Sequence, residues 1–410
     1  MTRHFSLKEL QQARAAIAAA GAARHIAIVV HSLSSGGAQR RLVSLANAFA
    51  AADREVDLVA LRGSGEIRHL LDERVRVTVL VSVAKPVWKP WFFDGWAPLR
   101  RWVREHRPDV VLAGITTVHA AAAMAVRELD RPPHLVLRAS RHPVRRYPWS
   151  RPLKRAFEPL ARRVRAPIYR RADLILAVSR ETADAVAEQC LEPGRCVVLP
   201  NPVLTSAFVA DVRAKRRIAL PAEAPLVLAI GRLSYQKRFD LLLEAFSKVR
   251  RETEAQLVIL GEGRLRQSLE RKARKLGLSD SVTMPGQVDD IADWLARADV
   301  VVSTSAFEGS PAVIIEALAA GVPVVASRCP GGSAELLEQW PCGMLVPPGD
   351  PGATAAAVLD ILRQHRSRRP AQDAFDEYTV DASARAYLDQ LDRLVAAPVQ
   401  STEPPLDRAA

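Results

Sequence analysis

The sequence predicts an α/β protein built from two doubly wound domains. At 410 residues the chain is longer than a single hydrophobic core usually supports, which favours two domains. Short apolar runs of strand type recur along the chain, and helical or loop segments separate them. This alternation is typical of parallel sheets with helices on both faces. Several of the runs also end in glycine-containing turns that lead into a helix, as at Gly36 and Gly231.

The amino-acid composition indicates a folded protein and favours anionic partners. Hydrophobic residues make up 49% of the chain, which is enough for large cores and excludes disorder for most of it. The net charge of +13 favours anionic partners such as nucleotides, nucleic acid or phospholipid. The four cysteines form no CxxC pair and no zinc-like spacing, so we expect a reducing compartment.

The first residues, 1–23, are expected to form a helical extension. Ser6 and Glu9 make a capping-box pattern, and charges spread through the segment argue against a secretory signal peptide. The longest uncharged run, Val110–Val126, is slightly short for a membrane-spanning helix and contains polar residues. We therefore expect a buried strand followed by a packed helix at that run.

The first domain is expected over residues 24–205. It opens with the strand His25–Val30, followed by a loop that contains Gly36 and Gly37 and then by a helix. Two adjacent glycines let the backbone approach a ligand closely, and the helix amino end favours a phosphate, although an ordinary turn is the alternative. Further strands are expected at Val56–Leu61, Val75–Val81, Val110–Leu112, His134–Leu137 and Asp173–Val178.

Two segments of this domain have an unusual composition. Residues 87–102 contain four tryptophans, two phenylalanines and several basic residues, which suits a membrane interface or a packed insertion. Residues 138–171 contain 12 Lys or Arg and a single acid, Glu158. A membrane surface, a lipid-linked phosphate or nucleic acid could neutralise this run, and a plain solvated face is the remaining alternative.

Residues 200–225 are expected to be the hinge, because they combine prolines with a basic cluster at 213–217. The second domain is expected over residues 206–376. Residues 377–396 are expected to form a helix that crosses back to the first domain, and 397–410 a flexible polar tail.

The second domain begins with the strand Leu226–Ile230, which runs into a loop that contains Arg232 and Lys237. Ligands bind at the carboxyl ends of strands in open α/β sheets, and an Arg with a Lys suits a diphosphate. Downstream, Gly261-Glu262-Gly263 is only a partial glycine motif, since Arg266 occupies its last position. A dinucleotide site is therefore not predicted.

The segment 303–321 predicts a strand, a turn and a helix, with Ser310 as the N-cap and Pro311 in the first helical position. The turn offers backbone N–H groups to an anion. Two carboxylates flank this site, because Glu308 lies in the turn and Glu316 lies inside the helix.

Taken together, these stretches resemble the retaining GT-B glycosyltransferases of the family-4 type over roughly His25 to Ala396. The resemblance rests on four ordered features: Gly36-Gly37, Gly231-Arg232-Leu233 with Lys237, Gly261-Glu262-Gly263, and the E-x7-E pattern from Glu308 to Glu316. It implies a GT-B fold, in which two Rossmann-like domains face each other across a cleft.

The resemblance also implies where the donor diphosphate binds. Arg232 and Lys237 would neutralise it, in agreement with their place after a strand. The backbone that follows Glu308 would hold the distal phosphate, through Gly309, Ser310, Pro311 and Ala312.

Further roles follow from the same resemblance. Glu308 would face the transferred sugar, Glu316 would bind the ribose hydroxyls, and Gly36 and Gly37 would approach the donor from the opposite domain. No Asp-x-Asp metal motif appears near the sugar site, so we expect no metal and no cofactor beyond the nucleotide-sugar substrate.

The family commonly carries a histidine after an N-domain strand that hydrogen-bonds the donor sugar. Here Arg138 stands at about that position and His142 follows a few residues later, so both are candidates for the sugar contact. His119 is a second histidine candidate, although a histidine on an apolar helix is more often structural.

The expected activity is retaining transfer of a hexosyl or N-acetylhexosaminyl unit, from a UDP-sugar in preference to other nucleotide-sugars. The expected acceptor is lipid-linked or a polysaccharide, as in bacterial lipopolysaccharide and other cell-surface glycan synthesis. We expect a cytoplasmic protein that is peripheral on the inner face of the membrane and binds its anionic surface. Nucleic acid is not expected, because no recognition module appears, and a non-catalytic GT-B scaffold is the alternative. The oligomeric state stays open.

Overall fold

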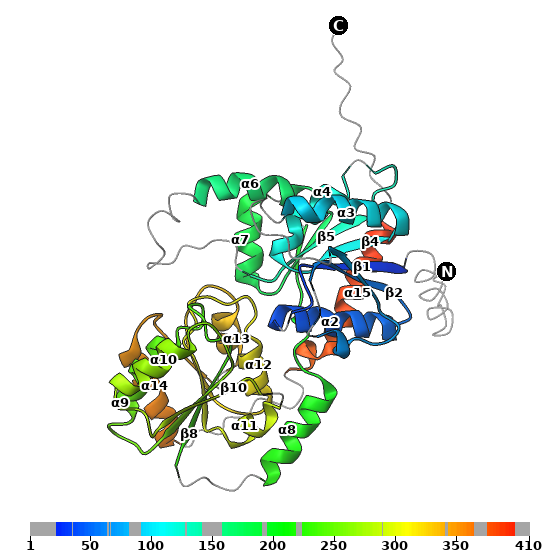
Figure 1. Cartoon of the computed structure of the whole chain (residues 1–410). Helices are drawn as coiled ribbons and strands as arrows, with labels where there is room; N and C mark the ends of the chain where they lie inside the picture. The colour runs from blue at the N-terminus through cyan, green and yellow to red at the C-terminus, as the bar shows by residue number, and fades with distance from the viewer. Residues whose placement is uncertain are drawn as a thin grey trace, which may run out of the picture.

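The computed structural model describes residues 22–34, 36–63, 65, 67–81, 92–127, 129–141, 158–190, 195–218, 224–288, 290–340, 343–364 and 375–397. Figure 1 shows two α/β domains, one above the other. The expected amino-terminal helix and the expected tail from 398 onward lie outside the described residues. The predicted fold class, two Rossmann-like domains, is confirmed.

The first domain contains a seven-stranded parallel sheet with the order β3-β2-β1-β4-β5-β6-β7. The strand order reverses beside β1, so the carboxyl ends of β1 and β4 mark the switch point where such sheets bind ligands. The strands are β1 (His25–Val30), β2 (Glu55–Arg62), β3 (Arg76–Val81), β4 (Val110–Ala113), β5 (His134–Ala139), β6 (Leu174–Ala177) and β7 (Cys196–Val198).

Helices cover both faces of this sheet, with α3 and α4 above it in Figure 1 and α2 and α15 below it. Almost every residue of β1 and β4 is buried, as the uninterrupted apolar runs predict. The helices are α2 (Gly37–Ala51), α3 (Phe92–His106), α4 (His119–Ala125), α6 (Glu158–Arg170), α7 (Arg180–Cys190) and α15 (Val380–Ala396), with short 3-10 turns η1 (Arg68–Leu70) and η2 (Thr116–Val118).

The second domain contains a six-stranded parallel sheet with the order β10-β9-β8-β11-β12-β13. Its switch point lies between β8 and β11, which are the strands that the two motif loops follow. The strands are β8 (Leu226–Ile230), β9 (Gln256–Leu260), β10 (Val282–Gly286), β11 (Val300–Ser303), β12 (Val324–Ser327) and β13 (Gly343–Val346).

Two hydrophobic clusters sandwich this second sheet. Helices α9, α10 and α14 pack in one cluster, and α8, α11, α12 and α13 in the other. The helices are α8 (Ser206–Ile218), α9 (Phe239–Val249), α10 (Arg266–Lys275), α11 (Ala292–Arg297), α12 (Ala312–Ala319), α13 (Ser333–Gln339) and α14 (Pro351–Gln364).

The expected hinge, residues 200–225, is not an open linker throughout, because half of it forms the helix α8. Val212 of α8 is buried in the second domain, so the basic cluster lies on a packed helix rather than on an open linker. The chain crosses between the domains just before α8 and again before α15. The two crossings lie side by side, since the amides of Val203 and Leu204 donate to the Tyr378 carbonyl, both at 2.9 Å. Helix α15 then packs in the first-domain core.

Two segments that suggested a membrane have packing roles where they are described. The uncharged run becomes β4, η2 and α4, which confirms the strand-and-helix interpretation. Trp102 of the aromatic segment is buried and Trp96 packs partly against the same core, while residues 87–91 lie outside the described part. Within the ranges that the structure describes, no helix has both the length and the apolar character needed to cross a bilayer.

Candidate active site

A cavity of about 1480 Å³ lies between the two domains, at the carboxyl edges of both sheets. Its walls come from the loops after β1, β5, β8 and β11, as the switch-point rule predicts. The structure brings most of the predicted residues to this one cavity: Gly37, Arg138, Arg232, Lys237, Glu308, Gly309, Ser310, Ala312 and Glu316 line it. Gly36 and Pro311 are their chain neighbours, and His142 lies outside the described residues.

Glu308 is a buried carboxylate that the cavity wall holds in place. Its Oε1 accepts from Lys237 Nζ and from Ser305 Oγ, each at 2.6 Å. The Gln236 amide lies 3.5 Å from Oε2. The carboxylate is therefore fixed by charge and by hydrogen bonding. Sequence analysis found Lys237 but missed Ser305, three residues before Glu308 in the same loop, and Gln236, which reaches Glu308 only because the loops after β8 and β11 meet.

The turn after Glu308 corrects the predicted helix start. Helix α12 begins at Ala312, and the N-cap position is occupied by Pro311, which makes no side-chain capping hydrogen bond. Proline has no N–H, so of the four backbone positions predicted to hold phosphate only three can donate. Among the described residues, the amides of Gly309, Ser310 and Ala312 donate to no backbone carbonyl.

Glu316 meets an unpredicted partner from the other domain. Arg41 of α2 donates from NH2 to Glu316 Oε1 at 2.9 Å, and both side chains line the cavity. Figure 1 shows α2 above α12 at this place. No local sequence pattern signals this contact, because the two residues lie 275 positions apart along the chain.

Two glycines allow the loops to approach one another closely. A Cβ on Gly309 would overlap the carbonyl oxygen of Ser140, which belongs to the first domain. Gly331 has φ of +111°, and a Cβ there would overlap the Glu308 carbonyl. These positions require glycine, because any side chain would push the Glu308 turn out of place or the domains apart.

A second interdomain contact lies near the amino ends of α7 and α13, where a carboxylate of each domain accepts a hydrogen bond from a backbone amide of the other. Glu181 of the first domain accepts from the Gly331 amide at 2.7 Å. Glu335 of the second domain accepts from the Arg180 amide at 2.8 Å, at the amino end of α7. The domains are therefore joined beside the Glu308 turn as well as through Arg41.

Arg138 is held by protein groups, although it borders the cavity. Its side chain donates to Tyr387 Oη at 2.9 Å, Asn201 Oδ1 at 2.5 Å and the Gly114 carbonyl at 3.4 Å. The residue is 1% exposed. This geometry favours a structural role, tying β5 to α15, over the expected contact with a sugar.

His119 lies behind the same strand. It is buried, its Nε2 is 3.2 Å from the Arg138 carbonyl, and it is not among the residues that line the cavity. Burial lowers the pKa of His119 to about 4, so the ring is neutral at physiological pH. Its placement supports the structural interpretation.

Two family models match the chain, one for each domain. Residues 35–207 match Glycosyltransferase Family 4, and residues 224–364 match Glycosyl transferases group 1. The chain belongs to the GT-B glycosyltransferases of the family-4 type.

Relatives of this glycosyltransferase include proteins of surface-glycan synthesis. The lipopolysaccharide core biosynthesis glycosyltransferase LpsE of Rhizobium meliloti is 33% identical over 199 residues, 47% of this chain and 57% of that protein. The chain spans about half the length of this and two other relatives that it matches at 33% and 36% identity. A Campylobacter jejuni protein is named as an α-1,4-N-acetyl-D-galactosaminyltransferase of a glycan linked to undecaprenol diphosphate. It is 28% identical over 349 residues, 84% of this chain and 90% of that protein.

Solved structures show the same fold. Anabaena HepE, crystallised with UDP and glucose, aligns with a TM-score of 0.73 at 22% identity. The alignment covers 90% of this chain and 99% of HepE. This likeness places the two domains of the glycosyltransferase in the GT-B arrangement.

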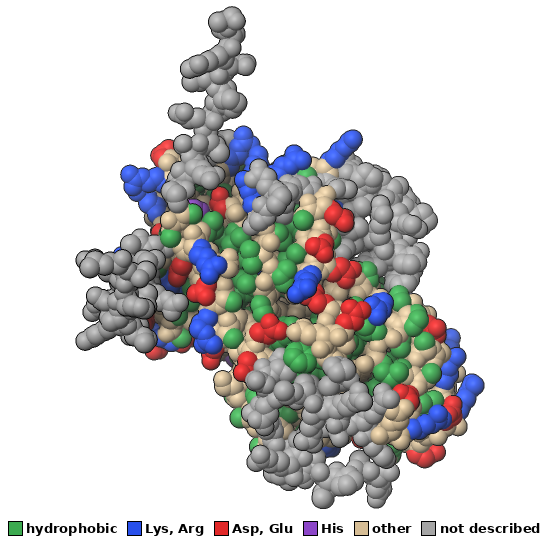
Figure 2. Space-filling view, turned by 180° about the vertical axis from the view of Figure 1, so that it is seen from behind, with side chains coloured by type: hydrophobic (Ala, Val, Ile, Leu, Met, Phe, Trp, Pro, Cys, Tyr) green, Lys and Arg blue, Asp and Glu red, His purple; other side chains and the backbone are tan. Residues whose placement is uncertain are grey.

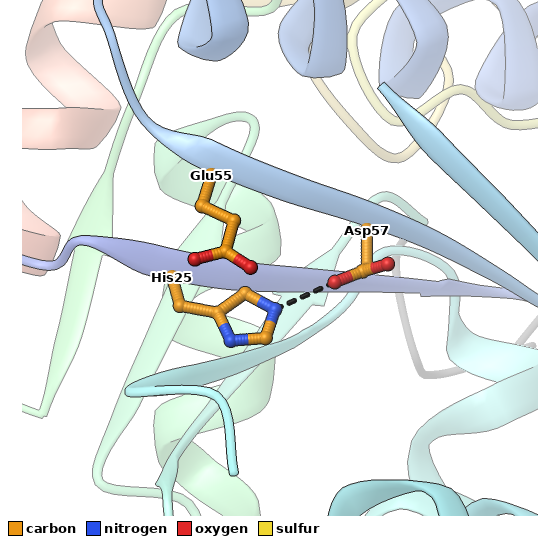
Figure 3. A group of neighbouring side chains, drawn as sticks. All are labelled: His25, Glu55 and Asp57. Carbon is orange, nitrogen blue, oxygen red and sulfur yellow. Dashed lines mark hydrogen bonds and ion pairs between the residues drawn. The ribbon is translucent and has the colours of Figure 1, made fainter. Parts of the chain in front are cut away.

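One ionisable cluster of the glycosyltransferase lies at the amino ends of β1 and β2, the sheet edge opposite the cavity. His25, Glu55 and Asp57 have potential ligand atoms within 4.8 Å of one another, and Figure 3 shows the His25 ring directed at Asp57. Arg76 contacts both carboxylates at 2.5 Å. Because a guanidinium already neutralises the acids, we interpret the group as an ion-pair network rather than as a metal site.

Proposed function

We propose that the chain is a metal-independent, retaining glycosyltransferase that moves a hexosyl or N-acetylhexosaminyl unit from a nucleotide-sugar to an acceptor hydroxyl. The observation that carries the proposal is the convergence of Arg232, Lys237, Glu308 and the α12 amino end on one interdomain cavity. Positive charge and free amides at one place suit a departing diphosphate.

Arg232 and Lys237 have different roles in this proposal. Arg232 is exposed in the cavity, and among the described residues it has no acidic partner. Its guanidinium can therefore engage a diphosphate through two parallel hydrogen bonds. Lys237 lines the same cavity and donates to Glu308 at 2.6 Å. It can neutralise charge that develops on the leaving group while it holds the carboxylate toward the sugar.

The proposed chemistry is front-face displacement. The acceptor oxygen forms a bond to the anomeric carbon on the face from which the nucleoside diphosphate leaves, and the bond from that carbon to the phosphate oxygen breaks. The departing phosphate takes the proton of the acceptor hydroxyl, so the configuration is retained. Glu308 positions the sugar and stabilises positive charge at its ring. Arg232, Lys237 and the backbone amides supply the charge that a metal ion would otherwise supply.

A UDP-sugar donor and a lipid-linked or polysaccharide acceptor complete the proposal. The presence of UDP in the HepE structures supports the donor. The undecaprenol-linked acceptor in the name of the Campylobacter relative supports the acceptor class and a role in bacterial surface-glycan synthesis.

We further propose that the protein works at the cytoplasmic membrane surface. Helix α6 lies at the outer end of the first domain in Figure 1. It exposes Arg163 and Arg170, and Val164 is 63% exposed between basic neighbours. Cations beside an exposed apolar side chain suit an anionic lipid surface. On the face shown in Figure 2, basic and acidic side chains are intermingled, which is unlike the basic stripe of a nucleic-acid binder.

A turnover and thermal-shift screen against UDP-, GDP- and ADP-sugars tests the donor. We expect one nucleotide class to stabilise the protein and to support transfer, with retained anomeric configuration and no loss of activity in EDTA. Arg232→Ala should lower turnover at least tenfold, because a charge-assisted contact to the diphosphate is lost. The control Arg271→Ala, at an exposed position on α10 outside the cavity, should leave turnover unchanged.

Three results would contradict parts of this proposal. Nucleotide binding without transfer or donor hydrolysis would favour the non-catalytic scaffold. Equal turnover in Arg232→Ala would remove the diphosphate assignment. Retention of duplex DNA with steep salt dependence, and no sedimentation with anionic liposomes, would contradict the membrane proposal.

A further inference from the structure

Arg41, which no motif marks, joins both domains at the donor side of the cavity. Its NH2 group donates to Glu316 Oε1 at 2.9 Å, and its NH1 group donates to the Val203 carbonyl at 3.0 Å. Val203 lies in the segment that crosses between the domains. One side chain therefore connects the first domain, the crossing segment and the second motif carboxylate.

The burial of this pair gives the contact an electrostatic role. The side chains of Arg41 and Glu316 are only 18% and 11% exposed. A carboxylate that is largely removed from water is costly unless a cation or a hydrogen-bond donor compensates for the lost hydration. Arg41 supplies both to Glu316 and fixes the position of its side chain.

The contact leaves part of the carboxylate available. Arg41 binds Oε1, and among the described residues nothing donates to Oε2. An ionised carboxylate accepts through both oxygens, so Oε2 can accept from a hydroxyl group in the cavity. The cis hydroxyls of a ribose are such donors.

We propose that Arg41 is a positioning residue for the nucleotide. It holds Glu316 in place through Oε1, so that Oε2 meets the ribose hydroxyls. Because Arg41 and Glu316 belong to different domains, the ribose site is complete only when the domains are together. This inference rests on the proposed function, since it takes a nucleoside diphosphate as the ligand of the cavity.

Calorimetric titration of the full chain tests the proposal, with UDP, GDP and ADP as probes and then the 2′,3′-dideoxy form of the one that binds best. Arg41→Ala should weaken binding of the ribonucleotide about tenfold, as expected for one charge-assisted contact. Arg41→Lys should recover part of the loss. The control Arg40→Ala, exposed on the same helix and outside the cavity, should bind as the wild type does.

Two readouts separate positioning from a merely structural effect. The dideoxy nucleotide should bind the wild type and Arg41→Ala equally, because it lacks the hydroxyls on which Glu316 acts. Glu316→Gln should reproduce the loss, and the double variant should add little to it.

Each other result counts against the proposal. Unchanged or tighter ribonucleotide binding by Arg41→Ala overturns it while the proposed function stands. The same loss for the ribose and dideoxy nucleotides overturns it too, since Arg41 would then act on another part of the ligand. If the wild type binds none of the three diphosphates, the proposed function fails and this inference fails with it.

Discussion

The two walls of the cavity are held in different ways. On the second-domain wall, Lys237 and Ser305 fix Glu308 within one pair of neighbouring loops. On the first-domain wall, Arg138 bonds to groups in α15 and in the segment after β7, and Arg41 reaches across to the other domain. The second-domain wall is thus built from contacts inside one domain, and the first-domain wall from contacts between distant segments.

This difference suggests a division of labour. In the proposed function, the second-domain wall carries the charges that act on the diphosphate and the sugar. The first-domain wall supplies shape and closure, through backbone at Gly37 and Ser140 and through Arg41. Substitutions on the second-domain wall should therefore mainly lower turnover, whereas buried substitutions in the first domain should mainly lower stability.

The largest effect is expected for Glu308→Gln. The substitution keeps the shape but removes the charge that faces the sugar, so turnover should fall about 1000-fold, the upper end for one electrostatic group in an active site. Steady-state kinetics with the active donor measures it. Glu338→Gln, at an exposed acid of α13, is the matched control and should be neutral. A fall in turnover of less than threefold in Glu308→Gln would contradict the catalytic role assigned to the second-domain wall.

Gly309→Ala should lower turnover about 100-fold, because the added Cβ meets the Ser140 carbonyl and displaces the turn or the opposing domain. The unfolding midpoint should change little, since each core is untouched. Gly352→Ala in the first turn of α14, where the nearest atoms are the ends of flexible side chains, serves as the control. Normal turnover in Gly309→Ala would show that close contact between the two walls is unnecessary.

Asp57→Asn tests the far edge of the first-domain sheet. Burial on its own raises the pKa of Asp57, but hydrogen bonds from His25 and Arg76 and the charge of Arg76 outweigh it and hold the pKa at about 2. A depressed pKa contributes stability above the unfolded value of 3.8, and that stability is lost as pH falls through about 2. Urea unfolding should show a loss of about 2 kcal/mol at pH 7 that shrinks below pH 4, with turnover unchanged.

Tyr387→Phe should have the smallest effect. It removes one hydrogen bond to the buried Arg138 guanidinium, which should cost about 1.5 kcal/mol of unfolding free energy. The KM for the donor should stay within twofold, because Arg138 keeps its bonds to Asn201 and Gly114. A large change in KM without loss of stability would instead favour the sugar contact first expected for Arg138.

Most of the fold could be predicted because its signals are local. Apolar runs gave β1 and β8 with the observed bounds. The errors also have local causes. Ser310 and Pro311 suggested an N-cap and a first helical residue, yet α12 starts one residue later. Prolines and basic residues suggested a linker at 200–225, where the structure has the helix α8.

The site could be predicted only where its residues directly follow neighbouring strands. Arg232, Lys237 and Glu308 follow strands that the sheet places side by side, so order along the chain was enough. The Arg41–Glu316 and Arg138–Tyr387 contacts join residues 275 and 249 positions apart. Such pairs depend on how the domains pack, and no pattern within a short segment encodes them.

Hydrogen–deuterium exchange with and without the best-bound nucleoside diphosphate tests the central claim most directly, which is that the interdomain cavity is the donor site. We expect protection in residues 232–238 and 306–317 of the second domain and in the first turns of α2, with none around His25 and Asp57. Binding that leaves 232–238 and 306–317 unprotected would contradict the account.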